Sequence, residues 1–165
     1  MFELKPLTRE AIPKALEKAE RDRLLNEPGE SESIRLDILG IDPENLEALV
    51  ALLLARTDQF ESAAVSVSQA REVLPRLHDE SRRADDAAII SERRAKAWLR
   101  HGGRGGESVA HDWFREAMAW FEKAEAIRPP GNDDALLRWN TCARLLMRHP
   151  HIRPEPEERS EPPLA

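Results

Sequence analysis

The sequence predicts an all-α fold, and three observations support that prediction. Ala, Leu, Glu and Arg, which are among the better helix formers, dominate the 165 residues. Apolar residues recur three and four positions apart along most of the chain, as they do on one face of a helix. No segment of the sequence alternates apolar and polar residues as a half-buried strand would. We therefore expect helices joined by short turns, without a sheet.

Turn and cap residues divide the chain into seven expected helices. Thr8 can cap the first helix, and Pro28 can occupy the first position of the second. Gly40 is a natural helix stop, and Asp42 followed by Pro43 provides a cap and a preset start for the third helix. The expected helices cover residues 8–25, 30–39, 46–59, 62–77, 81–100 and 108–127, and a seventh follows residue 134.

The apolar stripes identify the residues that we expect in the core. The third expected helix is apolar nearly all round, which is typical of a helix covered on several sides. The fifth carries a face of small residues, which lets a neighbouring helix approach closely. Trp98 and Trp139 should pack in the core rather than form a cage for a cationic ligand. In the sixth helix the expected core stripe is Val109, Trp113, Ala117, Trp120, Phe121, Ala124 and Ile127.

Two segments are expected to lie outside the helices. Residues 101–107 are rich in glycine and read as a flexible insertion. They lack the Lys-Ser/Thr ending of a phosphate-binding loop and follow a helix instead of a strand. Residues 149–165 are rich in Pro and Glu, so we expect a disordered tail there. The chain should thus contain one helical domain over residues 1–148.

Ala117, Phe121, Ala124 and Pro129 follow one another at spacings of four, three and five residues. This segment resembles the second half of a tetratricopeptide repeat, and a weaker copy ends at Pro43. The resemblance implies about three degenerate repeats of antiparallel helix pairs, stacked as a short right-handed superhelix with a C-terminal capping helix. A helix pair cannot bury its own apolar face, so stacking is also expected on physical grounds. The best-matching positions are Ala117, Phe121, Ala124 and Pro129, preceded by Ala95 and Trp98 in the first helix of that repeat.

The same resemblance implies a concave groove that binds a peptide or helix of a partner protein. The family's carboxylate clamp for chaperone C-termini is matched here at only one position, Arg93, so that ligand is not expected. Lys96 and Arg100 are four residues apart and point the same way on a helix, which favours an acidic or amphipathic peptide. The expected partner-binding residues are Arg23, Leu54, Asp58, Glu92, Lys96, Leu99 and Arg100.

The sequence offers little support for catalysis or metal binding. His78 with Asp79, and His111 with Asp112, are adjacent, whereas metal ligands on a helix lie three or four residues apart. Cys142 lies in the middle of a helix and is expected to be a buried structural thiol rather than a nucleophile. We therefore expect a non-enzymatic protein without a cofactor or a bound metal.

Composition limits the expected partners and location. The net charge of −6 argues against nucleic acid, since phosphate binding needs a basic face. No apolar stretch approaches the roughly 20 residues that span a bilayer, and charges begin near the N-terminus, so we expect no membrane segment or signal peptide. A single cysteine fits a reducing, cytoplasmic setting. The expected function is a protein-binding adaptor. The alternatives are a self-associating structural protein, such as a homodimer, and a non-catalytic subunit of an enzyme assembly.

Overall fold

The structure is a computed structural model that describes residues 1–156, and it confirms the all-α prediction for them. These residues form helices and turns, without a strand anywhere in 1–156. None of the helices in this part of the chain combines the length and the hydrophobicity needed to cross a bilayer. The helices are α1 (Ile12–Leu24), α2 (Pro28–Ile41), α3 (Leu46–Thr57), α4 (Val67–Arg71), α5 (Glu80–His101), α6 (Gly106–Ala126) and α7 (Asp134–Arg148), with short 3-10 turns η1 (Arg9–Ala11) and η2 (Leu74–Arg76).

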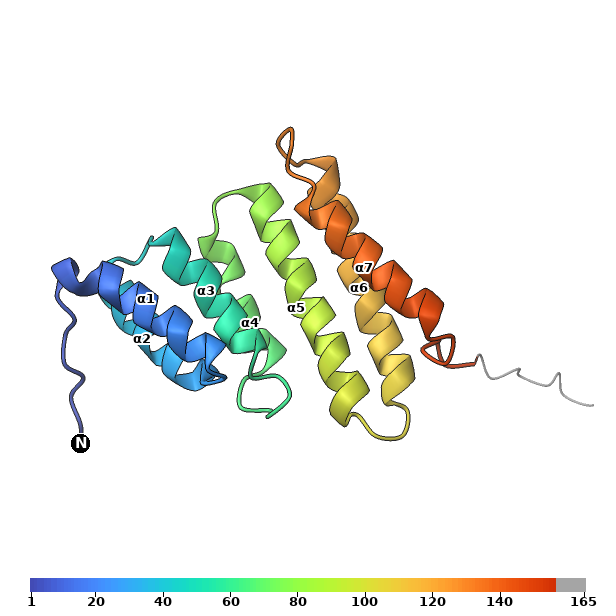
Figure 1. The fold of residues 1–165 in the computed structure, drawn as a ribbon, viewed down its shortest axis with the longest axis horizontal. Coiled ribbons are helices and arrows are strands. Elements are labelled where there is room, and N and C mark those ends of the chain that lie inside the picture. Colours follow the sequence, from blue (N-terminus) through green and yellow to red (C-terminus); the bar gives the residue numbers. More distant parts are fainter. Residues whose placement is uncertain (157–165) are drawn as a thin grey trace, which may run out of the picture.

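The helices form two layers along an elongated molecule (Figure 1). Helices α1, α3, α5 and α7 lie in one layer, which we call the odd layer, and α2, α4 and α6 lie behind it (Figure 1). Each helix packs on the next one in the sequence, and within the odd layer α1 contacts α3 and α3 contacts α5. The odd layer therefore presents one continuous face made of four helices that are distant in the sequence.

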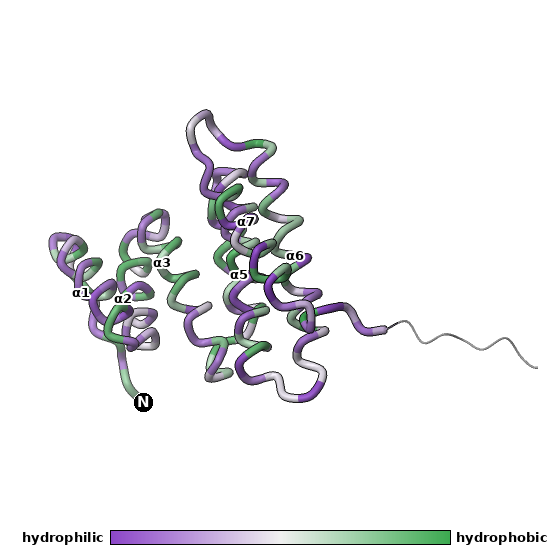
Figure 2. The backbone as a smooth tube through the Cα atoms, turned by 45° about the vertical axis from the view of Figure 1, so that its right-hand side comes forward, coloured by the Kyte–Doolittle hydropathy of each residue, from purple (hydrophilic) through white to green (hydrophobic). Residues whose placement is uncertain are grey.

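Helix α3 lies at the centre of the N-terminal half, as its apolar sequence predicts. It packs against α1, α2, α4 and α5, and Figure 2 shows it as one of the most apolar stretches of the chain. Leu49, Leu52 and Leu53 are each at most 2% exposed. Through these contacts α3 connects the α1–α2 pair to the long α5–α6 pair.

One helix start follows the expected local chemistry, and three other predicted helix ends do not. Pro28 is the first residue of α2, as predicted. Asp42 and Pro43 do not start α3 as predicted but lie in the turn before it, and Asn45 caps the helix by accepting a hydrogen bond from the Ala48 N–H at 2.9 Å. Thr8 makes no capping bond, because a 3-10 turn intervenes before α1. Gly40 does not end α2. The helix continues to Ile41, and the Asp42 N–H still donates an α-helical hydrogen bond to the Ile38 carbonyl oxygen.

The fourth helix is much shorter than the expected 62–77. The chain leaves α3 through turns in which Ala63 adopts a φ of 57°, a left-handed conformation that interrupts any helix. A new start follows at Ser66, which forms a reciprocal capping box with Gln69. Phe60 and Val65 are both buried, so this irregular segment packs against the core through their side chains.

The core stripe of α6 is rotated relative to the sequence prediction. Phe114 and Phe121 are fully buried, and Met118 is 5% exposed, whereas Ile127 is 42% exposed. The four tryptophans are half-buried at the rim of the core rather than inside it. Three of them lie beneath a cation, in the pairs Arg71–Trp113, Arg94–Trp98 and Lys123–Trp120.

The glycine-rich connection between α5 and α6 is tight. Gly102 is required by packing, because a Cβ atom there would lie 2.4 Å from the Trp98 carbonyl oxygen. Gly105 precedes α6 with a φ of 82°, which glycine adopts without strain. The segment therefore joins two closely packed antiparallel helices.

Packing continues past residue 148, where the sequence predicts the tail to begin. The Ile152 N–H donates a hydrogen bond to the His149 carbonyl oxygen at 2.9 Å, which turns the chain back after α7. The Ile152 side chain is only 5% exposed. The first residues of the expected tail are thus part of the folded domain, and residues 157–165 lie outside the described residues.

Candidate functional site

A charged cleft crosses the odd layer where α1 and α3 end. It has a volume of about 480 Å³ and is lined by residues of α1, α3, α5 and α7, by Pro28 at the start of α2, and by the turns that follow α1 and α3. We call it the cationic cleft, after its charged lining residues Arg23, Asp58, Glu61, Arg93, Lys96, Arg100 and Arg138.

Asp58 joins three helices at the centre of the cleft. It is the C-cap residue of α3. Arg23 of α1 donates from Nε to Asp58 Oδ2 at 2.6 Å, and Arg93 of α5 contacts the other carboxylate oxygen. One carboxylate is therefore shared by two guanidinium groups from different helices.

Glu92 lies beneath the cleft, and its carboxylate is also shared by two cationic side chains. Its side chain is only 2% exposed. Lys96 donates to Glu92 Oε1 at 3.0 Å, and Arg138 of α7 donates to Oε2. Burial by itself raises the pKa of Glu92, but the charges and hydrogen bonds of Arg138 and Lys96 outweigh burial and hold this pKa below its ordinary value. Glu92 is therefore ionised at neutral pH.

Glu61 lies at the open edge of the cleft, in the turn after α3. Arg100 contacts one of its carboxylate oxygens, and His101 Nε2 lies 3.4 Å from the other. The Arg100 side chain is 65% exposed. Water reaches this pair freely, so the contact contributes little to stability and can exchange with other anions.

Cations outnumber anions in the cleft. Five cationic side chains and two carboxylates line it, and the Glu92 carboxylate beneath brings the anions to three. The whole chain has a net charge of −6, so this excess of positive charge is a local feature. A low-dielectric wall on several sides strengthens the field of such a cluster. The arrangement suits a ligand that carries several negative charges.

The structure brings together most of the partner-binding residues expected from the sequence. Arg23, Asp58, Lys96 and Arg100 line the cationic cleft, and Glu92 lies directly beneath it. The apolar pair does not contribute. Leu54 and Leu99 are half-buried, pack against the hydrophobic core and are absent from the cleft lining.

Three of the charged residues that line the cleft were not among the expected partner-binding residues: Arg93, Glu61 and Arg138. The place of Arg93 could have been predicted from the sequence. It precedes Lys96 by three residues and Arg100 by seven, and these spacings place all three on one helix face. No sequence spacing predicts that Glu61 or Arg138 lies beside these residues. They reach the cleft only because the turn after α3 and the helix α7 fold against α5.

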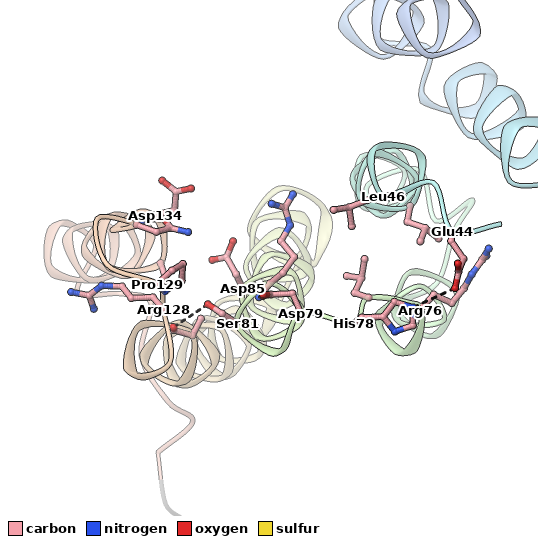
Figure 3. Close-up of a pocket in the computed structure, with 16 residues that line it drawn as sticks. Glu44, Leu46, Arg76, His78, Asp79, Ser81, Asp85, Arg128, Pro129 and Asp134 are labelled. Carbon is pink, nitrogen blue, oxygen red and sulfur yellow. Dashed lines mark hydrogen bonds and ion pairs between the residues drawn. The ribbon is translucent and has the colours of Figure 1, made fainter. Parts of the chain in front are cut away.

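A second cavity lies on the odd layer near the beginning of α5 (Figure 3). Its volume is about 500 Å³. Its walls include Leu46 and Leu49 of α3, Leu77 after η2, and Ala135 of α7. We call it the apolar pocket. The carboxyl group of Asp85 projects from α5 on the side facing α7 (Figure 3).

Cys142 is buried, as the sequence predicts. Its side chain is 1% exposed and forms no disulfide. Burial raises the pKa of the Cys142 thiol to about 12. The thiol is therefore protonated at neutral pH and unsuited to nucleophilic attack.

Comparisons with protein-family models, with curated proteins and with solved structures give no match to this chain.

Proposed function

We propose that this chain is a non-catalytic adaptor, built from stacked tetratricopeptide-like helix pairs, whose cationic cleft binds an acidic segment of a partner protein. The observation that carries the proposal is the sharing of Asp58 and Glu92, each between two cationic side chains, beside the exposed Arg100–Glu61 pair. Each shared carboxylate leaves cationic charge that an acidic ligand can neutralise. The layered helix pairs supply the rigid frame across which such a segment would lie.

Solvent exposure of the cations supports binding at this site. The side chains of Lys96 and Arg138 are 39% and 37% exposed, and that of Arg100 is 65% exposed. These groups can contact a ligand without first losing a buried partner. Single exposed ion pairs contribute only about 0.2–1 kcal/mol each, so useful affinity requires several acidic residues in one segment.

An apolar side chain lies at the edge of the cleft. Leu24, at the end of α1, lines the cleft and is 75% exposed. It can take the role that the sequence assigned to Leu54 and Leu99. A partner segment with an apolar residue next to its acidic run therefore fits better than a purely acidic one.

The test uses fluorescein-labelled octaglutamate as the probe and fluorescence anisotropy as the measurement. We expect binding that weakens as salt rises from about 50 to 300 mM, because salt screens exposed charges. The double variant Lys96→Gln with Arg100→Gln should bind roughly 2- to 30-fold more weakly. Glutamine is chosen because a carboxylate at position 96 would face the buried Glu92 and disturb the fold.

The matched control is Arg104→Gln with Arg115→Gln. Both residues are exposed, and neither lines the cleft. This variant loses the same charge, so it should bind octaglutamate about as tightly as the parent. Equal weakening in both double variants would show that net charge alone attracts the probe and would rule out the cleft as the site.

A further inference from the structure

The apolar pocket contains a carboxylate that the fold leaves without a partner. Asp85 Oδ1 is inaccessible to solvent and accepts no hydrogen bond from any residue in 1–156. A buried acceptor without a donor costs about 1–3 kcal/mol of stability. Rotation about χ2, which has a broad energy minimum in Asp, can turn this oxygen toward the pocket.

The cations near Asp85 are occupied by other carboxylates. Arg82 Nε lies 3.4 Å from Asp86 Oδ2, and Arg138 contacts Glu92. Arg128, at the other side of the pocket, pairs with Asp133 at 3.2 Å and with Glu125 at 3.3 Å. No ion pair within the described residues therefore neutralises Asp85.

A second acidic group lies across the same pocket. Asp134, the first residue of α7, lines the pocket on the side toward which Asp85 projects, and its own carboxyl group points away from Asp85 (Figure 3). Burial raises the pKa of Asp85, and the charge of Asp134 raises it further, against the opposing effects of Arg138 and Arg82. A cationic donor beside Asp85 would supply the missing hydrogen bond and stabilise the buried charge of this carboxylate.

Apolar and charged residues together form the remainder of the wall. The apolar ones are Leu46, Leu49, Leu77 and Ala135, with Ala124 and Pro129 from the end of α6 and the turn after it, and the charged or titratable ones are Glu44, Arg76, His78, Asp79, Arg82 and Arg128. A volume of about 500 Å³ falls in the range of pockets that enclose small ligands. The pocket thus offers an apolar surface for the body of a ligand and a carboxylate for a donor at its head.

We propose that the apolar pocket binds a primary ammonium group on an apolar chain, with Asp85 accepting a hydrogen bond from the ammonium. The group is supplied either by a free alkylamine or by a lysine side chain of a protein. The proposal does not rest on the cationic cleft. Asp85 and Lys96 are 11 residues apart on α5, which is about 16 Å along a helix.

The test titrates ¹⁵N-labelled protein with n-hexylamine near neutral pH and follows amide signals by NMR. We expect saturable shifts in the first turns of α5 and α7, with hexan-1-ol binding much more weakly because it lacks the charge. Asp85→Asn should weaken hexylamine binding about tenfold or more, since a charged hydrogen bond is lost. Asp37→Asn is the matched control, because Asp37 is exposed on α2 and lies outside the pocket.

A second measurement needs no variant. Saturating hexylamine should lower the pKa of Asp85 in a carboxyl ¹³C titration, and hexan-1-ol should leave it unchanged. The peptide acetyl-Leu-Lys-Leu-amide separates the two sources: tighter binding than hexylamine assigns a protein lysine, and weaker binding assigns a free amine. The proposal fails if hexylamine and hexan-1-ol bind equally, or if Asp85→Asn and Asp37→Asn bind the amine alike.

Discussion

Arg138 of α7 donates a hydrogen bond to the buried carboxylate of Glu92 on α5, across 46 positions of sequence. This contact joins the last helix to the longest one, and it places a cation of α7 in the cationic cleft. The stability of the fold and the proposed binding therefore depend on the same pair. Because Glu92 is 2% exposed, the carboxylate needs compensation whether or not a ligand is present.

Arg138→Gln should destabilise the fold by about 1–3 kcal/mol, measured by urea unfolding near neutral pH. The loss falls below the 3–5 kcal/mol typical of a broken buried pair because Lys96 still contacts Glu92 and because Arg138 is partly exposed. Arg144→Gln is the control, since Arg144 is exposed on the same helix. Equal stability of the two variants would contradict a structural role for the Arg138–Glu92 pair.

Asp86→Asn should stabilise the protein near neutral pH and have a smaller effect near pH 4. Burial raises the pKa of Asp86 to about 6, against the opposing charge of Arg82. A raised folded-state pKa means that the folded state binds the proton more tightly, so stability is highest below the unfolded pKa of about 3.9 and falls as pH rises through about 6. Thermal unfolding at both pH values gives the difference, which we expect to be about 1–3 kcal/mol. A pH-independent effect of the substitution would disprove this account.

Phe121→Ala should cost about 3–5 kcal/mol, because a fully buried aromatic ring leaves a cavity. Trp120→Ala, one position earlier, should cost clearly less, since Trp120 lies half-buried at the rim with Lys123 over its ring. Chemical denaturation of both variants tests the helix register. The reverse order of the two losses would mean that α6 is rotated relative to the structure.

Ile152→Ala should destabilise the domain by about 1–3 kcal/mol, because the side chain is buried beyond the end of α7. This replaces the sequence-based expectation that the disordered tail begins at residue 149. His151→Ala is the control, as His151 is exposed. Indistinguishable melting curves for the two variants would place Ile152 outside the core.

Glu61→Gln should tighten the binding of octaglutamate by roughly 1.5- to 5-fold, the amount that one exposed ion pair provides. The substitution releases Arg100 and His101 from their shared carboxylate. Glu116→Gln removes the same charge outside the cleft lining and serves as the control; among residues 1–156 its ion-pair partner is Arg71. Unchanged affinity in the Glu61 variant would mean that Arg100 does not contact the ligand.

Local sequence chemistry was sufficient for those parts of the fold that neighbouring residues control. Helix content follows from composition and periodicity, and the start of α2 at Pro28 follows from a residue that favours a first helical position. Part of the cationic cleft was predictable for the same reason. Lys96 and Arg100 share a helix face by spacing alone, and Arg93 belongs to that face too.

Tertiary packing determined those features of the fold that the spacing of residues along the sequence does not. Trp113 and Phe114 both fit an apolar stripe, but they point about 100° apart on the helix, and contact with α5 selected the smaller ring for the core. The turns after α3 broke a helix that periodicity predicts. Arg138 reaches Glu92 only because α7 folds beside α5. The sequence therefore determined the helices and one charged face, whereas the packing of helices distant in the chain determined which side chains meet, because such contacts have no local signal.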